Sequence, residues 1–413
     1  LRDLMMRSLL YSFLALTGLH AQALDSSLLS KEKSEAFKLD TEKVEAEAGK
    51  LAGSWINPIQ ASYSGSFKEQ FGYEQEQYNA LIQINQPIFK SGGIWFAINY
   101  AAATEHYNKL GVSIQKKGVI KEVISMMMQL RKLDLSIEKM TLQINDAHVS
   151  LLDNQEQAMA GELDDALVNL QEIALNTLEM TKLDLMNQRE GLLHQLAVFS
   201  DADYKTTTLP VLNLLDADTF VKRSIDIAQM QANSEKTGSY RNMIVAKYLP
   251  TINVTASYNF NRAVNQAFSE TFVIGAQDSN GDYINESDYY NYGFSLSMIL
   301  DVNIFKDIQS AQVDHIKAQV ELSQKQKEMK HYYEMVVRKV KNIETKIALA
   351  TKNQALYKKV LDRTKQAFRA GDESKLGLQK SENQLAIKAI DLKMFEWDKQ
   401  IELLALYAKI HSE

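Results

Sequence analysis

The hydrophobic residues of this 413-residue chain change their spacing along the sequence, and they do so twice in the same order. First, apolar residues alternate with polar ones, which is the pattern of strands with two unlike faces. Apolar residues then recur at steps of three and four over long stretches, which is the pattern of long helices. A fold that satisfies both patterns must join strand pairs to long helices, twice.

Two short sequences support a duplicated unit. Ile88-Phe89-Lys90 recurs as Ile304-Phe305-Lys306, and Ala160-Gly161 recurs as Ala370-Gly371, at offsets of 216 and 210 residues. Matches in the same order at nearly one spacing indicate an internal repeat. The predicted organisation is a first repeat over 24–200, an inter-repeat linker over 201–218 and a second repeat over 219–413.

Four amphipathic strands are predicted, at about 55–68, 77–86, 251–262 and 289–302. Their polar positions hold Ser, Asn, Gln and Thr rather than Lys or Glu, as in strands that line a water-filled lumen. Each alternation covers roughly ten residues, the length that a tilted strand needs to cross the hydrocarbon layer of a membrane. The side chains expected to face lipid are Tyr63, Phe67, Tyr78, Ile82, Ile84, Val254, Tyr258, Phe260, Tyr292, Phe294 and Leu296. A soluble sheet with one buried face would alternate in the same way, so that alternative stays open.

Prolines mark the predicted strand ends, because proline has no amide hydrogen to donate to a sheet. Pro58 precedes the first strand, Pro87 follows the second and Pro250 precedes the third. A polar, turn-rich loop is expected over 263–288, as in the long outer loops of membrane barrels.

Long helices follow each strand pair. Apolar residues step by four and three from Val119 to Leu151, which is a coiled-coil seam of more than four heptads. Val336 to Ala350 repeats this pattern, and Trp397 continues it near the C-terminus. Gly161 and Gly371 lie where one helix must turn back into the next. Beside an N-terminal helix, the predicted helices span about 93–159, 162–200, 219–247, 305–369 and 372–411.

Residues 1–23 resemble a secretory signal peptide. Arg2 and Arg7 precede an apolar stretch from Leu9 to Leu19, and Ala21-Gln22-Ala23 follows as a cleavage site. We therefore expect an exported protein, with cleavage after Ala23. The chain has no cysteine, so disulfides do not stabilise it, and a net charge of −6 does not indicate a nucleic-acid-binding surface.

The predicted strands also bear on assembly. Four strands are too few to close a barrel, and an open sheet edge in hydrocarbon would leave backbone donors and acceptors unpaired. Several chains must therefore pool their strands. Two chains would give eight strands and a lumen filled by side chains, whereas three would give twelve and room for water.

The order of these elements resembles the TolC family of outer-membrane efflux proteins across nearly the whole mature chain. The resemblance rests on the joint order and spacing of four fragments, Gln86-Pro87-Ile88-Phe89, Tyr248 to Ile252, Leu300 to Phe305, and Phe368-Arg369-Ala370-Gly371. It implies a mixed α and β membrane protein, in which coiled-coil hairpins form an α-helical tunnel in the periplasm. It also implies a homotrimer in the outer membrane whose strands form a twelve-stranded β-barrel in contact with lipid.

The same resemblance implies a function and partners. The chain would be the exit duct of a tripartite efflux or type I secretion system, with a periplasmic adaptor (membrane fusion) protein and an inner-membrane transporter as partners. Drugs, metals and secreted proteins all remain open as cargo. A periplasmic coiled-coil adaptor, or a structural or adhesive surface protein, is the alternative.

The hairpin tips are the predicted gate. At the positions where the family places two gate aspartates, this chain has Gly377 and Lys380, so that role is not carried over. Other carboxylates follow each tip glycine, and threefold symmetry would turn an inward-facing one into a ring that attracts cations. Phe368 matches an aromatic residue at the family's tip. The candidate gate residues are Gly161, Glu162, Asp164, Asp165, Phe368, Gly371, Asp372 and Glu373. Acidic residues also favour helix N-termini, and simple solvation of these acids stays open.

No enzyme, metal or cofactor site is predicted. The seven histidines are scattered without ligand spacing, and no phosphate-binding glycine loop or nucleophile motif occurs. Met126 to Met128 are consecutive residues that point in different directions around a helix, and they are expected to pack in the protein core rather than to bind a metal.

Overall fold

The computed structural model describes residues 26–70, 73–265, 276–277 and 283–411, so the predicted signal peptide lies outside the described residues. The chain divides into two compact units. One, which we call the rod unit, contains Leu1–Asp40, Leu110–Ala228 and Gln324–Glu413; the other, the sheet unit, contains Thr41–Lys109 and Gln229–Ser323. Each unit therefore combines segments from both sequence repeats.

The sheet unit holds an antiparallel sheet whose order is β1-β2-β3-β5-β4. The four long strands are β1 (Gln60–Gln70), β2 (Tyr73–Phe89), β3 (Thr251–Asn265) and β5 (Tyr283–Ser297), and β4 (Ala276–Gln277) adds two residues at the edge. All four predicted strands are present. The strands are longer than their alternating patterns, so the predicted loop over 263–288 is shorter than expected.

Pro87 lies within β2, and the prediction that it follows the strand is wrong. The pairing of β2 with β3 shifts register between Pro87 and Phe89, and Phe89 then pairs with Ile252. A β-bulge tolerates proline because the bulged residue need not donate a ladder hydrogen bond. The strand can therefore continue for two residues beyond the proline.

Two helices, α3 (Gly93–Met159) and α7 (Ile304–Ala370), have 67 residues each and run from the sheet unit into the rod unit. At 1.5 Å per residue each is roughly 100 Å long. In the rod unit, α4 (Asp165–Phe199) returns from α3, and α8 (Lys375–Tyr407) returns from α7. The remaining helices are η1 (Ser26–Leu28), α2 (Lys31–Ala52), α5 (Ala217–Lys222) and α6 (Ile225–Lys247).

The helix predicted over 219–247 is in fact two helices, α5 and α6. The break falls at Arg223 and Ser224, where backbone groups form hydrogen bonds with the C-terminal segment. Ser224 and Ile410 form an isolated β-bridge, Ile225 N donates to Lys409 O at 2.9 Å, and His411 N donates to Arg223 O at 2.7 Å. These contacts join segments nearly 190 residues apart, so no local pattern indicates them.

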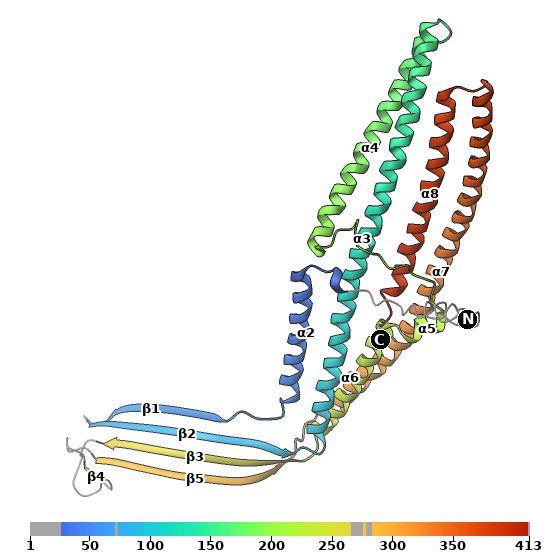
Figure 1. Ribbon diagram of the computed structural model, residues 1–413. Coiled ribbons are helices and arrows are strands. Elements are labelled where there is room, and N and C mark those ends of the chain that lie inside the picture. Colours follow the sequence, from blue (N-terminus) through green and yellow to red (C-terminus); the bar gives the residue numbers. More distant parts are fainter. Residues whose placement is uncertain (1–25, 71–72, 266–275, 278–282, 412–413) are drawn as a thin grey trace, which may run out of the picture. The chain divides into compact units, whose positions relative to one another are not determined.

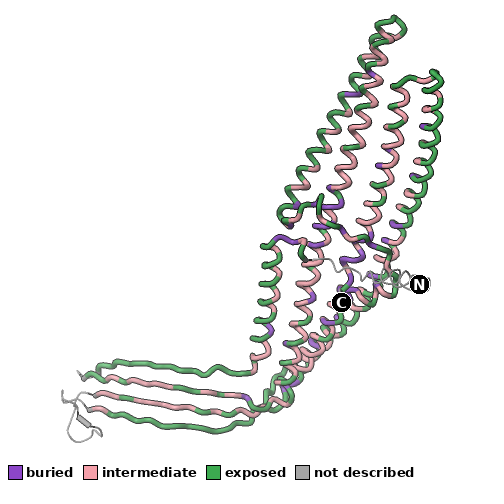
Figure 2. Tube along the Cα trace, viewed as in Figure 1, coloured by how far each residue is buried: buried purple, intermediate pink, exposed green. Residues whose placement is uncertain are grey.

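Within the rod unit, the helices lie in the order α4, α3, α8, α7 (Figure 1). Few buried residues lie toward the two hairpin tips, and the most deeply buried side chains lie nearer the other end of these helices (Figure 2). The fully buried side chains of α3, α5, α7 and α8 are Val123, Ile124, Met127, Met128 and Leu130, Phe220, Val336 and Val340, and Leu403, Leu404 and Leu406. In the described part of the chain, no helix combines the length and the hydropathy needed to cross a bilayer.

Candidate functional site

The sheet has two chemically distinct faces, and its register brings all eleven side chains expected to face lipid onto one of them. Tyr63 lies opposite Ala80, Ile82 opposite Tyr258, and Val254 opposite Phe294. Residues directly opposite in a ladder project to the same side, so these pairs extend one apolar face across all four long strands. Most of that face is exposed, and Tyr292 reaches 86% exposure.

The opposite face is polar. Its ladder rows join Ser64, Asn79 and Asn261, and likewise Gln83, Ser257 and Asn291. Gln83 Nε2 donates to Gln60 Oε1 at 2.5 Å on this face. Leu81 and Tyr289 form an apolar and aromatic row with Asn259 on this face. Lys68 also lies on it, near the end of β1. The sheet therefore presents mostly uncharged polar groups on one side and mostly aromatic and aliphatic groups on the other, where charged residues such as Glu76, Arg262 and Asp288 lie toward one end.

The sheet also has open edges. Among the described residues, β1 pairs only with β2, and the outer side of β5 pairs with β4 at Tyr283 and Ile284 alone. The remaining length of both edge strands presents unpaired backbone groups. Such an edge is a template for pairing with another strand.

The two hairpin tips share one geometry. Gly161 (φ 74°) and Gly371 (φ 84°) follow the ends of α3 and α7 in the left-handed conformation. The amides of Gly161 and Glu162 donate to Ala158 O and Gln157 O, and those of Gly371 and Asp372 donate to Phe368 O and Ala367 O. These paired bonds form a Schellman motif at each tip, which satisfies the last carbonyl groups of each long helix.

The candidate gate acids of the two hairpins form different hydrogen bonds. Asp164 is the N-cap of α4, and its Oδ1 accepts from Ala166 N at 2.8 Å. In the second hairpin that position belongs to Ser374, whose Oγ accepts from Gly377 N at 2.9 Å. Glu373 Oε1 accepts from Ser374 N at 3.0 Å. Asp164 thus caps α4, whereas Glu373 binds the backbone amide of Ser374, the residue that caps α8.

The other tip residues are on the surface of the single chain. Glu162, Asp165 and Asp372 are exposed, and Phe368 is more than one third exposed. The structure therefore leaves these side chains available to a neighbouring molecule or to solvent.

A set of polar contacts joins the two hairpins through α3 and α8. Lys132 Nζ lies 2.5 Å from Asp398 Oδ1, and Lys139 Nζ lies 2.7 Å from Asp391 Oδ1. Nearer the tips, Asp146 accepts from Asn383 Nδ2 at 2.6 Å and from Gln384 Nε2 at 3.1 Å. We call these three connections the α3–α8 polar contacts. Their members are spaced by seven residues on each helix, so they recur on one side of a heptad seam.

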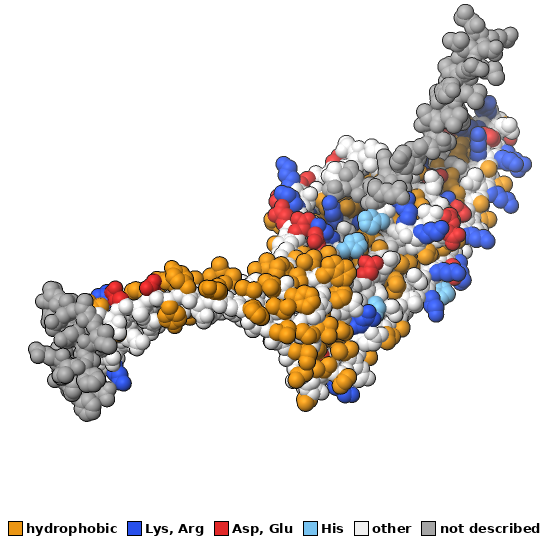
Figure 3. Space-filling model, turned by 90° about the horizontal axis from the view of Figure 1, so that it is seen from below, with side chains coloured by type: hydrophobic (Ala, Val, Ile, Leu, Met, Phe, Trp, Pro, Cys, Tyr) orange, Lys and Arg blue, Asp and Glu red, His pale blue; other side chains and the backbone are white. Residues whose placement is uncertain are grey.

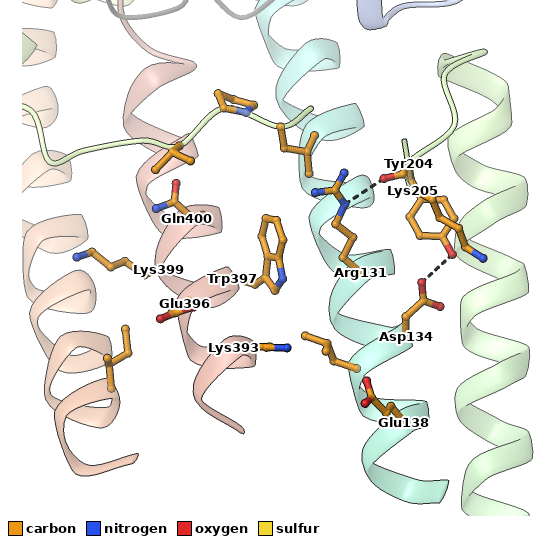
Figure 4. Close-up of a pocket in the computed structure, with 15 residues that line it drawn as sticks. Arg131, Asp134, Glu138, Tyr204, Lys205, Lys393, Glu396, Trp397, Lys399 and Gln400 are labelled. Carbon is orange, nitrogen blue, oxygen red and sulfur yellow. Dashed lines mark hydrogen bonds between the residues drawn. The ribbon is translucent and has the colours of Figure 1, made fainter. Parts of the chain in front are cut away.

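A cavity of about 960 Å³ opens beside these contacts, under the linker (Figure 4). Arg131 lies over the Trp397 ring at 5.4 Å and donates to the backbone oxygens of Tyr204 and Thr207. Tyr204 OH donates to Asp134 Oδ2 at 2.8 Å, and Arg189 Nε donates to Asp134 Oδ1 at 2.7 Å. Burial, followed by the hydrogen bond to Asp134, raises the pKa of the Tyr204 phenol. Asp134 thereby ties α3 to α4 and to the linker.

Sequence reasoning missed this cavity and the α3–α8 polar contacts. Trp397 was expected to continue a coiled-coil seam, but its indole forms part of the cavity wall. A tryptophan among aliphatic heptad residues is the one local signal that could have pointed there. Among the described residues, no three His, Cys, Asp or Glu side chains come together in a group that could bind a metal ion.

No protein-family model and no curated protein matches this sequence. Solved structures do match it over almost its whole length. The CmeC outer membrane channel of Campylobacter jejuni is 14% identical with a TM-score of 0.71, covering 94% of this chain and 86% of that chain. The outer membrane protein VceC of Vibrio cholerae is 11% identical with a TM-score of 0.69, at 94% and 95% coverage. The MtrE channel of Neisseria gonorrhoeae, solved in its open state, is 12% identical with a TM-score of 0.66, at 91% and 85% coverage.

At these identities the likeness establishes the fold. The chain has the fold of TolC-type outer membrane channels, in which long helices are joined to a small antiparallel sheet. The fold expected from the sequence is therefore confirmed for the single chain.

Proposed function

We propose that this protein is an outer-membrane exit duct, a passive channel for cargo that a periplasmic adaptor and an inner-membrane pump deliver. The observation that carries the proposal is the sheet with one largely exposed apolar face, one mainly uncharged polar face and two open edges. A water-soluble protein would have to cover that apolar face, whereas a lipid bilayer is a suitable environment for it. The solved channels that share the fold support the same conclusion.

The open edges favour an assembly of identical chains. In hydrocarbon, the free backbone groups of β1 and β5 would cost several kcal/mol each unless they pair. Pairing β1 of one copy with β5 of the next satisfies both edges. Three copies would contribute twelve long strands, and a barrel of that size leaves a lumen for water inside its polar face. The proposal is therefore a homotrimer.

Engineered cysteines test this pairing. The chain has no cysteine, so a pair such as Ser64→Cys in β1 and Asn291→Cys in β5 introduces the only thiols. We expect a set of such pairs, stepped along both strands, to include one that forms disulfides between copies and gives a trimer that resists denaturing electrophoresis. The matched control pairs Ser64→Cys with Asn79→Cys, which already lie opposite within one chain. If only the control forms a disulfide, at every step, then β1 and β5 do not meet and the closed barrel is wrong.

The hairpin tips are the proposed gate. Gly161 and Gly371 form the turns, and the carboxylates of Glu162, Asp165 and Asp372 are exposed around them. In a threefold assembly these acids would form rings at the closed end that attract cations. Replacing Asp164 and Asp165 together by Ala should raise single-channel conductance or weaken cation block in planar bilayers. Unchanged current would remove these two residues from the gate.

Fractionation separates this function from that of a periplasmic adaptor. A duct should be found in the outer membrane as a heat-modifiable trimer. A soluble periplasmic monomer would instead support the adaptor.

A further inference from the structure

Large exposed side chains continue beyond the end of the sheet where the strands meet the helices. Figure 3 shows hydrophobic side chains gathered over that end of the molecule. Val302 is 94% exposed and Trp95 is 62% exposed, although both are apolar. We call this group the collar; its members are Phe89, Trp95, Met298, Leu300, Val302 and Phe305.

The collar begins at the last row of the apolar face of the sheet. Phe89 pairs with Ile252, which pairs with Leu296, and this row is the last of the apolar face. Met298 and Leu300 follow Leu296 just beyond the end of β5, and both are exposed. Past the ladder, exposed apolar side chains recur on the first turns of α3 and α7, where Trp95 and Phe305 lie.

A long stretch of this surface has no charged residue, and a charged residue lies at each of its ends. No charged residue occurs from Tyr289 to Leu300 on and after β5, and Asp288 and Asp301 bound that stretch. β5 ends at Ser297, so nine of these twelve residues lie in the strand and span about 30 Å along it. A tilt of about 40° reduces this to roughly 23 Å across a membrane. The apolar band of a membrane barrel is about 25 Å tall, so the strand part of the uncharged stretch matches that band.

Three collar residues lie beyond the first charges at this end. Trp95 and Val302 follow Lys90 and Asp301, and Phe305 precedes Lys306 directly. Lys306 Nζ lies 3.4 Å from Gln309 Oε1 at the surface. Aromatic and aliphatic side chains mixed with lysines are typical of the layer between headgroups and acyl chains.

We propose that Trp95, Val302 and Phe305 insert into the headgroup–acyl boundary of a phospholipid leaflet. The first turns of α3 and α7 are then part of the membrane contact. Lys90 and Lys306 extend toward lipid phosphates while their alkyl chains cover the boundary. This inference rests on the proposed function, because it requires the sheet to cross a bilayer.

Tryptophan fluorescence tests the position of the collar. The chain has three tryptophans, so W55F/W397F leaves Trp95 as the only one. The full chain is reconstituted in phosphatidylcholine vesicles that carry bromine either near the headgroup end or near the tail end of the acyl chains. Trp95 emission should fall by about half with the shallow bromines and less with the deep ones, because interfacial side chains lie about 5–10 Å into this boundary. Phe305→Trp in a background without the three natural tryptophans should behave in the same way.

Two further variants distinguish a failure of the collar proposal from a failure of the proposed function. W55F/W95F leaves Trp397, which lies on the cavity wall of the rod unit and should not be quenched. Tyr292→Trp in the tryptophan-free background reports on the apolar face of the sheet and should be quenched most by the deep bromines. If Tyr292→Trp is quenched but Trp95 and Phe305→Trp are not, a second copy or the lumen covers the collar and this inference is wrong. If none of the reporters is quenched, the sheet is not in lipid and the proposed function fails with it.

Discussion

The two helical hairpins start from the same sequence pattern but occupy different environments. α3 and α7 have 67 residues each and end in the same Schellman turn, at Gly161 and Gly371. In the first hairpin, the outgoing helix α3 is the inner one and the returning helix α4 is at the edge of the layer. In the second hairpin the roles are reversed, because the returning helix α8 is inner and α7 is at the edge.

The two returning helices differ in burial although they hold the same position in the repeat. The buried residues of α4 are Leu175 and Leu196, whereas those of α8 are Ile387, Ile390, Leu403, Leu404, Leu406 and Tyr407. Large apolar side chains on the edge helix α4, such as Leu170 and Leu183, are exposed in the single chain. A duplicated sequence thus produces one returning helix that stabilises the chain and another whose outer face is open to a partner.

The largest expected effect comes from truncating the inner returning helix. Leu404→Ala on α8 removes a side chain with 0% exposure and should lower the free energy of unfolding by about 3 kcal/mol. The matched change on α4, Leu183→Ala, affects a side chain with 59% exposure and should cost less than about 1 kcal/mol in the separated chain. Urea unfolding followed by circular dichroism in detergent measures both. Equal losses in the separated chain would show that the two returning helices are equally buried, which would contradict the difference between α4 and α8.

The next effect concerns the tip-proximal member of the α3–α8 polar contacts. Asp146→Ala leaves the Asn383 and Gln384 amides without their shared acceptor and should cost about 1–2 kcal/mol. Asp153→Ala is the control, because Asp153 accepts only from Gln157 one turn along the same helix. Hydrogen exchange of α8 near Gln384 should become faster in the first variant and stay unchanged in the second. The same change in both would mean that the contact between hairpins is not what orders this segment.

The tip glycines should respond equally, which tests the similarity of the hairpins. Gly161→Ala and Gly371→Ala meet no atoms within 4 Å, so the cost arises from the positive φ alone and should be about 1 kcal/mol each. Gly191→Ala within α4 also has open space and should instead stabilise the helix by about 0.5–1 kcal/mol. Thermal unfolding of the three variants gives the comparison. A clear difference between the two tips would contradict a shared turn.

The smallest expected effect is the coupling between Lys139 and Asp391. Both side chains are partly exposed, so water screens the pair and a double-mutant cycle with Ala should give about 0.5 kcal/mol. The pair Lys325 and Glu328, which are three residues apart within α7, should give no more than this. A coupling of several kcal/mol at Lys139 would mean that the hairpins are held together mainly by charge.

The sequence was sufficient for elements that a local period determines. Alternation indicated the faces of the four long strands, because a two-residue period leaves little freedom once one face is apolar. Heptads and Gly161 indicated the hairpins. The same reasoning could not distinguish α4 from α8, because both carry a heptad pattern and the difference lies in which helix becomes the neighbour.

The remaining features depend on residues distant in the sequence. Arg223 and Ser224 interrupt a helical pattern because the C-terminal segment at Ile410 pairs with them. Pro87 remains in a strand because a bulge accommodates it. Lys139 and Asp391 are ordinary surface charges until α3 and α8 come together. The tip acids are candidates by position alone, and their local contacts, such as the cap that Asp164 forms on α4, appear only in the structure.

The heptad spacing of the α3–α8 polar contacts restricts how the length of this protein can evolve. Lys132, Lys139 and Asp146 advance by seven residues while their partners on the antiparallel helix retreat by seven. An insertion of one residue in α3 alone would rotate every later contact residue of α3 away from its partner on α8 by about 100°. Viable insertions or deletions should therefore come as whole heptads in both helices at once, so that the rod grows or shrinks in steps of roughly 10 Å.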